Sequence, residues 1–351
     1  MEMMRAFAAH GYEVYALGNE PAEKWESRFA ENGVTYRQIE VSRNGVSVAG
    51  DLHTLSSIKK QLREIMPEKI FTFQAKTVIY GVIAARSLGI TEVYPLIAGV
   101  GSVFLSGDLK SKIVRRIIVA EYKYALKKCG TVFFQNMDDV ETFESYKIVR
   151  RENVVMLHGS GVDTEKFAVT PLPEKPAFLC ISRLIRDKGV CEYLDAAREL
   201  KKKYPETRCL LVGPFDTNPS AIKPEELQPY IDDGTIEYFG EQEDVRPYID
   251  QSSVYVLPSY REGTPKTVLE AMSCGRAVIT TDAPGCRETT TDGVNGCLVP
   301  VKDVAAIVEK MEYFITHPDV IPEMGAKGRA LAESTFDVRK VNKTICQSMK
   351  L

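Results

Sequence analysis

The sequence predicts an α/β protein of two domains, each built on a doubly wound parallel sheet and both facing one cleft. The chain has 351 residues, which is enough for two separate cores, and its composition is that of a soluble globular protein. Short apolar runs alternate with stretches of helical period almost throughout, as in repeated βαβ units. Three prolines in the ten residues from Phe167 to Pro176 mark the expected hinge between the two series.

The first series holds six expected strands and three long expected helices. The strands are Glu13–Leu17, Thr35–Ile39, Lys69–Phe73, Val93–Ile97, Thr131–Phe134 and Val154–Leu157. The helices, marked by apolar residues three and four positions apart, are Asp51–Met66, Thr77–Leu88 and Ser111–Lys128. Residues 1–10 are expected to add a helix in front of the first strand.

The second series repeats the same alternation. Its expected strands are Ala177–Ser182, Cys209–Val212, Ile236–Phe239, Val254–Leu257 and Ala277–Thr281. Its expected helices are Val190–Tyr204, Val245–Gln251, Thr267–Ser273 and Val304–His317. A last helix at Phe336–Met349, apolar along one face, is expected to cross back and brace the first domain.

The stretch Tyr260–Arg276, YREGTPKTVLEAMSCGR, carries the strongest functional signal and follows a buried strand. We expect Thr264 to cap a helix, with Pro265 in its first turn and Gly275 at its end. The free N–H groups of this helix, expected at Lys266, Thr267 and Val268, would then form a phosphate site at the carboxyl end of the strand.

Two acids accompany this expected phosphate site. Glu262 precedes the helix and Glu270 lies within it, eight positions later. Carboxylates are strong acceptors for the hydroxyl groups of sugars, so the pair is suited to the sugar parts of one ligand. An arbitrary pair at this spacing is more often one solvated and one helix-face glutamate, but Gly263, Pro265 and the preceding strand favour binding.

A basic pair follows the first strand of the second series. Arg183 and Lys188, in SRLIRDKG, leave the carboxyl end of that strand, and we expect them to face the same cleft as Glu262. Two cations can neutralise a departing pyrophosphate. A basic surface turn is the alternative. Two later segments, 282–288 and 292–296, are predicted to be turns. They either close the cleft or are structural, and we favour the structural interpretation for Asn295-Gly296.

These linked motifs, SRLIRDKG, REGTPKTVLEAMSCG, PGCRE and DGVNG, resemble the retaining nucleotide-sugar glycosyltransferases of family GT4. The resemblance spans nearly all of residues 160–335 and implies the GT-B fold, with two Rossmann-like domains. It implies that Arg183 and Lys188 bind the donor diphosphate, that Glu262 contacts the donor sugar and that Glu270 holds the ribose. The donor-binding set expected from it is completed by Gly263, Thr264, Lys266, Thr267, Val268 and Val245.

The first half resembles the family more loosely, through AHGYEV, FQAKTVIYGVIAARSLGI and AGVGSVF. These pieces are similar to the branch that acts on lipid-diphosphate-linked sugars in capsule, O-antigen or glycan assembly. The family's opening strand and glycine turn have no counterpart in the sequence. The expected domains are 1–165 on the acceptor side, 166–335 for the donor and 336–351 for the returning helix.

Two features of the first half are expected to serve the acceptor. Gly99 and Gly101 follow a strand and allow close approach to a ligand, although a tight turn explains them equally well. The segment Leu109–Lys128 is basic and amphipathic. It is either a membrane-surface helix or a buried helix with a solvated basic face. Its cations are Lys110, Lys112, Arg115, Arg116, Lys123, Lys127 and Lys128.

Several classes of protein are disfavoured. His10, His53, His158 and His317 lack metal-ligand spacing and Asp138-Asp139 is not a D-x-D motif, so no metal or other cofactor is expected. A nicotinamide dehydrogenase is unsupported without a G-x-G-x-x-G turn, and a net charge of −3 does not suggest nucleic acid. The scattered cysteines, with no C-x-x-C pair, indicate a reducing compartment, so a cytoplasmic protein, peripheral to the membrane at most, is expected.

The sequence therefore predicts a glycosyltransferase that moves a hexosyl or N-acetylhexosaminyl group from a UDP-sugar to a hydroxyl acceptor with retention. The expected acceptor is a polyprenyl-diphosphate-linked sugar. Two alternatives stay open: an isomerase of the same architecture, similar to UDP-sugar 2-epimerase, and a non-catalytic UDP-sugar-binding protein.

Overall fold

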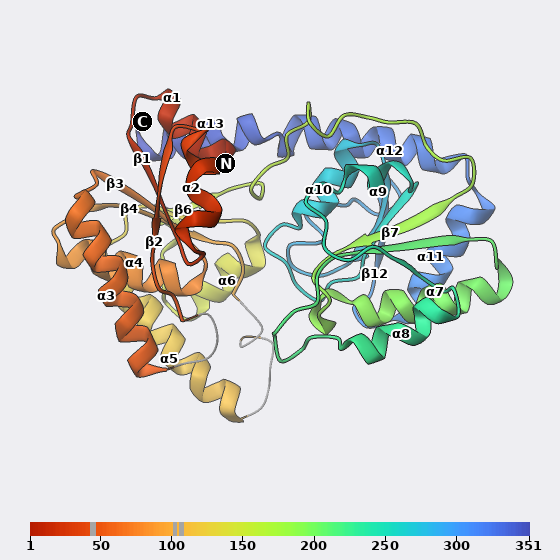
Figure 1. Cartoon of the computed structure of the whole chain (residues 1–351), viewed down its shortest axis with the longest axis horizontal. Coiled ribbons are helices and arrows are strands. Elements are labelled where there is room, and N and C mark those ends of the chain that lie inside the picture. The colour runs from red at the N-terminus through yellow and green to blue at the C-terminus, as the bar shows by residue number, and fades with distance from the viewer. Residues whose placement is uncertain (43–46, 101–103, 105–108) are drawn as a thin grey trace. The chain divides into compact units, whose positions relative to one another are not determined.

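The computed structural model describes residues 1–42, 47–100, 104 and 109–351 (Figure 1). The chain forms two compact units, Met1–Leu157 with Val341–Leu351, and His158–Lys340. The expected boundaries at 165 and 335 lie inside the second unit. The reason is a parallel bridge between Val162 and Asp337, in which the Val162 N–H donates to the Phe336 carbonyl and the Val338 N–H donates to the Val162 carbonyl.

The first unit contains two parallel sheets where one was expected. One pairs β1 (Val14–Gly18) with β2 (Val34–Gln38). The other has the order β3-β4-β5-β6, formed by Lys69–Phe73, Glu92–Ile97, Val132–Phe134 and Val154–Met156. The helices are α1 (Glu2–Ala9), α2 (Ala22–Ala30), α3 (Val48–Ile65), α4 (Ala75–Ser87), α5 (Leu109–Leu126) and α6 (Met137–Ser145).

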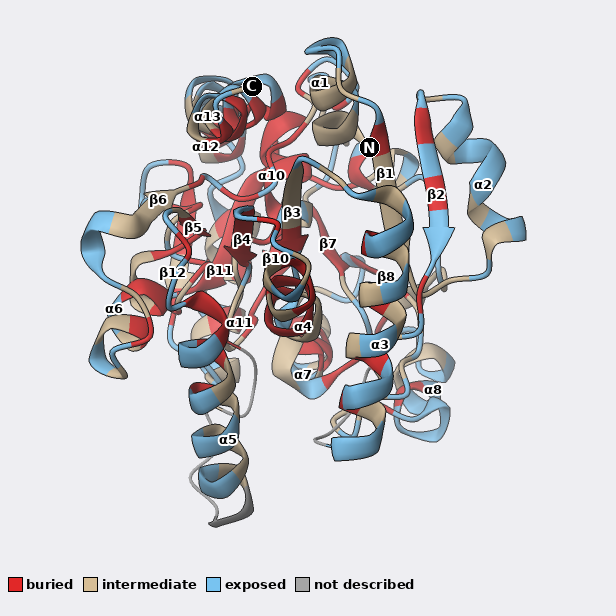
Figure 2. Ribbon diagram, turned by 90° about the vertical axis from the view of Figure 1, so that its left-hand side faces the viewer, coloured by how far each residue is buried: buried red, intermediate tan, exposed pale blue. Residues whose placement is uncertain are grey.

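The four-stranded sheet is covered on both faces, as the alternation of its side chains requires. Val93 and Ile97 of β4 join the core under α3, α4, α5 and α6. Tyr94 and Leu96 point to the opposite face, where they pack with Ile345 of α13 (Val338–Met349). Figure 2 shows β4 as largely buried and β3 as largely intermediate, with many exposed residues along α3 and α5.

The second unit is built on one six-stranded parallel sheet of order β12-β11-β10-β7-β8-β9. These strands are β7 (Ala177–Ile181), β8 (Arg208–Val212), β9 (Glu237–Tyr238), β10 (Val254–Leu257), β11 (Ala277–Thr281) and β12 (Gly296–Val299). The helices are α7 (Val190–Lys203), α8 (Pro224–Asp232), α9 (Arg246–Asp250), α10 (Lys266–Ser273), α11 (Val304–Thr316) and α12 (Val320–Leu331). Figure 1 shows α7, α8 and α11 on one side of this sheet and α9, α10 and α12 on the other.

The proline-rich segment at 167–176 is not the connection between the units, which corrects the expected hinge. Its Phe167 is buried, and the Ser273 hydroxyl donates to the Phe167 carbonyl at 2.6 Å. Arg276, fully buried, donates to the Thr170 carbonyl at 2.8 Å and to the Pro171 carbonyl at 3.2 Å. These bonds hold the segment against the second unit, where prolines fit because their missing N–H is not needed.

The elements that were not predicted include α2, α8, α12 and β12. Proline or glycine interrupts three of them: α8 contains Pro224 and Pro229, α12 contains Pro322 and two glycines, and β12 begins with Gly296. Proline and glycine disfavour helices and strands locally, so tertiary packing must stabilise these three elements. A Cβ at Gly325 would lie 2.0 Å from the Gly275 carbonyl oxygen, so glycine lets α12 approach the end of α10 closely.

Candidate functional site

The strand order of the second unit places a binding crevice beside β7 and β10. The chain winds outward from β7 through β8 and β9, and in the other direction from β10 through β11 and β12. Ligands of open parallel sheets bind at such a switch point, outside the carboxyl ends of the two strands. The segments at that position are 182–189 after β7 and 258–265 after β10.

These two segments are pressed together at their backbones. Gly189 has φ +71°, and a Cβ on it would lie 2.0 Å from the Pro258 carbonyl oxygen. The Tyr260 N–H donates to the Asp187 carbonyl at 2.9 Å. Only glycine fits at position 189, and the contact brings the basic loop to the acidic loop.

An ion pair in the crevice joins Lys188 to Glu262. The Lys188 Nζ atom donates to Glu262 Oε1 at 2.5 Å, and the side chains are 21% and 12% exposed. A cation and an anion are therefore held at one point, partly shielded from water, where Coulomb interactions are stronger than on an open surface. Lys188 was expected to face the same cleft as Glu262, and the structure brings the two side chains into contact. The roles of both residues stay predictions.

A third loop supports Glu262, and sequence reasoning did not assign it this role. The Glu262 N–H donates to the Pro284 carbonyl at 2.9 Å, in the segment after β11. Gly285 has φ +83°, and a Cβ on it would lie 2.2 Å from the Glu262 carbonyl oxygen. The Pro284-Gly285 dipeptide was visible as a turn signal, but its contact with Glu262 depends on the tertiary structure.

The N-cap of α10 lies one residue later than expected. Pro265, not Thr264, is the N-cap of α10, and the Val268 N–H donates to the Pro265 carbonyl at 3.1 Å. The free N–H groups of the first turn therefore do not include that of Val268. Thr264 packs beside Gly159 instead, where an added Cβ would lie 2.8 Å from the Thr264 Cβ.

The remaining residues of α10 fall on two faces. Lys266 is exposed, whereas the Thr267 Oγ1 accepts a hydrogen bond from the buried Tyr255 hydroxyl at 2.6 Å. Glu270 is 6% exposed and pairs with Lys266 at 3.3 Å. Burial raises the pKa of Glu270, and the Lys266 ammonium opposes that shift. A buried carboxylate of this kind is a strong acceptor for a ligand's hydroxyl groups.

Arg183, at the start of the basic loop, pairs with an acid and not with Glu262 in the contacts described. Its Nη1 atom donates to Asp216 Oδ2 at 2.8 Å, in the segment after β8. Although burial opposes it, hydrogen bonds from Asn218 and Arg183 lower the pKa of Asp216, so the carboxylate stays ionised. Arg183 is thus held by a neighbour that the sequence did not predict.

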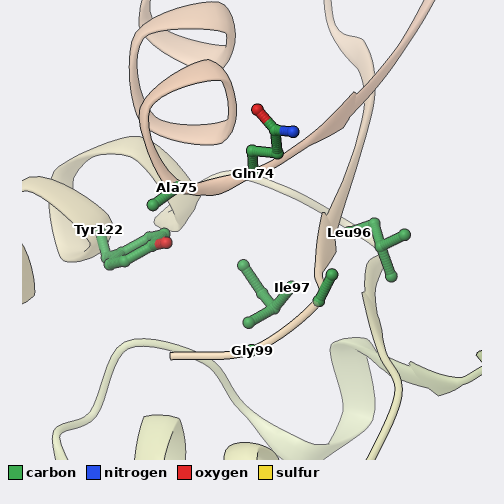
Figure 3. Close-up of a pocket in the computed structure, with 7 residues that line it drawn as sticks. Gln74, Ala75, Leu96, Ile97, Gly99 and Tyr122 are labelled. Atoms are coloured by element: carbon green, nitrogen blue, oxygen red, sulfur yellow. The ribbon is translucent and has the colours of Figure 1, made fainter. Parts of the chain in front are cut away.

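Val245, Gly99 and Gly101 are the remaining predicted residues. Val245 precedes α9 as its N-cap, beyond the carboxyl end of β9. In the first unit, Gly99 lines a cavity at the ends of β3 and β4 (Figure 3). Gly101 lies outside the described residues. In the described part of the chain, no three His, Cys, Asp or Glu side chains gather as ligands for a metal ion.

The fold and the sequence families agree on the class of protein: a glycosyltransferase of the GT-B fold, as predicted. Residues 175–317 match the family of glycosyl transferases group 1, and residues 1–136 match the glycosyl transferase 4-like family. Together the two models span most of the chain. The chain belongs to these glycosyltransferase families and is a transferase.

Individual relatives agree with this assignment. The N,N'-diacetylbacillosaminyl-diphospho-undecaprenol alpha-1,3-N-acetylgalactosaminyltransferase of Campylobacter jejuni is 25% identical over 329 residues, which are 90% of this chain and 85% of the relative. The structure of sucrose-phosphate synthase from Thermosynechococcus elongatus is similar at a TM-score of 0.80 and 18% identity, covering 99% of this chain and 91% of that one. The structure of Anabaena HepE in complex with UDP is similar at 0.76 and 17%, covering 99% and 95%.

Proposed function

We propose that the protein transfers a hexosyl or N-acetylhexosaminyl group from a UDP-sugar to a hydroxyl of a lipid-diphosphate-linked sugar, with retention of anomeric configuration. The observation that carries this proposal is the Lys188–Glu262 pair at the switch point of the second sheet, beside the first turn of α10. A cation for the diphosphate and an acid for the sugar lie together there.

The chemistry divides among the residues of the crevice. The bond from the sugar's anomeric carbon to the diphosphate breaks, the acceptor oxygen bonds to that carbon, and the acceptor proton passes to an oxygen of the leaving diphosphate. Lys188 and Arg183 would stabilise the charge that develops on the leaving group, with the N–H groups at the start of α10. Glu262 would hold the sugar's hydroxyls, and Glu270 would hold the ribose. Both roles depend on the ability of carboxylates to accept hydrogen bonds from hydroxyl groups.

Binding of the donor changes the partner of Lys188. Its ammonium group now pairs with Glu262 at 2.5 Å. A diphosphate would compete for that ammonium, which would free the Glu262 carboxylate to accept hydrogen bonds from the sugar. Binding of the diphosphate and binding of the sugar would thus be coupled, since the diphosphate draws Lys188 away from the carboxylate that binds the sugar.

The donor and acceptor classes are supported by the relatives. HepE binds UDP in its solved structure, and the Campylobacter relative is named for a diphospho-undecaprenol-linked acceptor. We infer that this chain uses a UDP-sugar and an acceptor of that kind, with the second unit binding the donor and the first the acceptor.

The test is a screen of UDP-sugars against lipid-diphosphate-linked sugars, with product linkage determined by NMR. Transfer with retention is the expected result, and it should survive EDTA because no metal is required. Conversion of the UDP-sugar without an acceptor would indicate an isomerase instead. UDP binding without any turnover would indicate a binding protein.

We also propose that α5 contacts an anionic membrane surface, which would bring the enzyme to a lipid-linked acceptor. Its exposed face combines apolar residues with cations, and Figure 2 shows the exposed stripe along it. Its exposed residues include Lys112, Ile113, Arg116, Ile117, Ala120, Lys123 and Tyr124, and the exposed Lys127 and Lys128 follow its end. Each cation near an anionic leaflet contributes about 1 kcal/mol, and the apolar side chains insert between headgroups. None of the helices that the structure describes is both long and apolar enough to cross a membrane.

Vesicle sedimentation tests this contact. Changing Ile113 and Ile117 together to Glu should abolish binding to vesicles that contain phosphatidylglycerol, and Val301→Glu, at an exposed apolar site of the second unit, should not. Equal binding by the double variant and the wild type would contradict the contact.

A further inference from the structure

The first unit contains a cavity that the donor site does not use. It lies where β3 and β4 end and α4 begins, and its volume is about 120 Å³. Its apolar walls are formed by Ala75, Leu96, Ile97, Ala98 and Gly99, and its polar members are Gln74 and Tyr122 (Figure 3). The carboxyl ends of parallel strands are where ligands of this fold class bind.

The chain keeps this cavity open through its backbone. Gly99 has φ +129° and carries no side chain, and Ala98 adds one methyl group. Gln74 has φ +71°, a left-handed conformation that costs a non-glycine residue free energy and is concentrated at functional sites. Gln74 is also the N-cap of α4 and makes no side-chain capping bond, which leaves the first turn of the helix without a side-chain partner there.

The hydroxyl of Tyr122 is the unusual group in the cavity. The side chain is 2% exposed, and its ring packs edge-on against Phe143 at 5.0 Å between centroids. Figure 3 shows the hydroxyl directed toward the space between Ala75 and Ile97. Burial, and then the nearby Asp139 carboxylate, raise the pKa of Tyr122, so the hydroxyl stays protonated and can donate.

Size and lining restrict what can bind here. One water needs roughly 10–15 Å³ of such space, and a whole small-molecule ligand roughly 300–1,000 Å³. A cavity of about 120 Å³ therefore suits a substituent of a few atoms and not a complete sugar. No lining residue is charged, so an anionic substituent lacks a partner. An acetamido group fits, because its methyl contacts apolar walls and its carbonyl accepts from a hydroxyl.

We propose that this cavity is the acceptor subsite for an acetamido group, and that the enzyme selects N-acetylated sugars as acceptors through it. Tyr122 donates to the acetamido carbonyl, while Ala75, Ile97 and Ala98 enclose the methyl group. This inference rests on the proposed transfer to a sugar acceptor and assigns the feature of the acceptor that is recognised. A hydroxyl in place of the acetamido group would leave the apolar walls unfilled.

The first test compares two acceptors that differ only at one position, N-acetylglucosaminyl and glucosyl diphosphate linked to the same short lipid. Wild-type kcat/KM should favour the acetamido acceptor by roughly tenfold or more, as apolar pockets discriminate by such factors. Tyr122→Phe removes one hydrogen bond and should reduce that preference by roughly three- to tenfold. Ala98→Leu should fill the cavity and abolish the preference. Rates with the glucosyl acceptor should change little in both variants.

Matched controls separate recognition from damage to the fold. Tyr15→Phe removes a hydroxyl of β1 that donates to the Glu13 carboxylate, and Ala30→Leu enlarges an exposed alanine of α2. Both should keep the wild-type preference. UDP affinity, measured by calorimetry, should be the same in all four variants.

A second measurement does not depend on turnover. The soluble N-acetylglucosaminyl diphosphate analogue should bind the wild type more tightly than Tyr122→Phe and Ala98→Leu in calorimetric titration. A wild type that does not distinguish the two acceptors, or a Tyr122→Phe variant that keeps the full preference, overturns the subsite while leaving the transferase assignment intact. Transfer to neither acceptor, with UDP still bound, would instead count against the proposed function, and the titration would then decide the subsite.

Discussion

At the scale of single residues, the site depends on charged side chains that are partly buried. Lys188 and Glu262 approach to 2.5 Å with most of each side chain covered. Removing one partner of such a pair leaves the other charge without compensation, which costs more than the pair contributes. The pair also lies at the switch point of the sheet, where ligands of this fold class bind, which supports a role in binding.

The first prediction concerns these two residues. Glu262→Ala and Lys188→Ala should each lower kcat/KM for transfer by more than tenfold, or more than about 1.4 kcal/mol of transition-state stabilisation. Lys188→Ala should weaken UDP binding, whereas Glu262→Ala should impair mainly the sugar-dependent step. Arg246→Ala, at an exposed ion pair with Asp244, is the control and should transfer sugar at the wild-type rate. Wild-type rates in both site variants would refute the assignment.

The second prediction concerns the buried acid on α10. Burial raises the pKa of Glu270, so ionisation of this group opposes folding at neutral pH. A group whose pKa is raised by folding stabilises the protein at low pH and loses that contribution as pH rises through its folded-state pKa. Glu270→Gln should therefore raise the melting temperature at pH 7 by about 1–4 °C while weakening donor binding.

Two measurements check that prediction. Melting curves of Glu270→Gln and the wild type should converge as the pH is lowered toward 4, because both side chains are then neutral. Calorimetry with UDP should show weaker binding by the variant. A variant that binds UDP as the wild type does would remove Glu270 from the donor site.

At the scale of elements, the loops after β7, β10 and β11 pack against one another through their backbones. Gly189 and Gly285 are the points of closest approach, to the carbonyl oxygens of Pro258 and Glu262. Both have positive φ, so a side chain would bring both strain and a clash. The geometry of Glu262 is thus fixed by a glycine more than twenty residues later in the chain.

The third prediction uses that dependence. Gly285→Ala should displace the Glu262 backbone and lower kcat by more than tenfold, since a displacement of about 1 Å can cost a hundredfold. Gly293→Ala is the matched control, because Gly293 has φ +71° but no atom within 4 Å of an added Cβ. The control should lose roughly 1 kcal/mol of stability from strain and keep its kcat. Steady-state kinetics and melting curves separate the two effects, and equal kcat in both variants would contradict the positioning role.

At the scale of the whole molecule, one buried arginine determines to which unit a long segment belongs. Arg276 is 0% exposed and donates to the carbonyl oxygens of Ile249, Thr170, Cys274 and Pro171. Burial lowers the pKa of Arg276, yet an arginine stays protonated under these conditions. Its bonds attach the proline-rich segment to the second unit, and the two units connect at residues 157–158 and 340–341.

The fourth prediction tests this anchor. Arg276→Met should leave several buried carbonyl groups unsatisfied and lower the free energy of unfolding by about 2–4 kcal/mol. Arg208→Met, at an exposed ion pair with Glu237, should cost about 1 kcal/mol or less. Urea denaturation measures both. Equal losses would show that the buried bonds of Arg276 add nothing beyond an exposed pair.

The sequence by itself determined the class of fold and most of the donor motif. Alternation of apolar strands and amphipathic helices depends on local periodicity, which is a property of neighbouring residues, so β7, β10 and α10 could be predicted within one or two positions. Lys188 and Glu262 could be expected together because both follow parallel strands.

The tertiary structure decided what long-range packing controls. It placed Pro284 and Gly285 against Glu262, Asp216 against Arg183, and the 167–176 segment against Arg276. It also formed the cavity at Tyr122, whose walls come from residues 74 to 122. Such contacts depend on which loops meet at one edge of a sheet. Which loops meet is determined by the order of the strands and by glycines that allow close approach of two backbones. The local sequence pattern predicts neither.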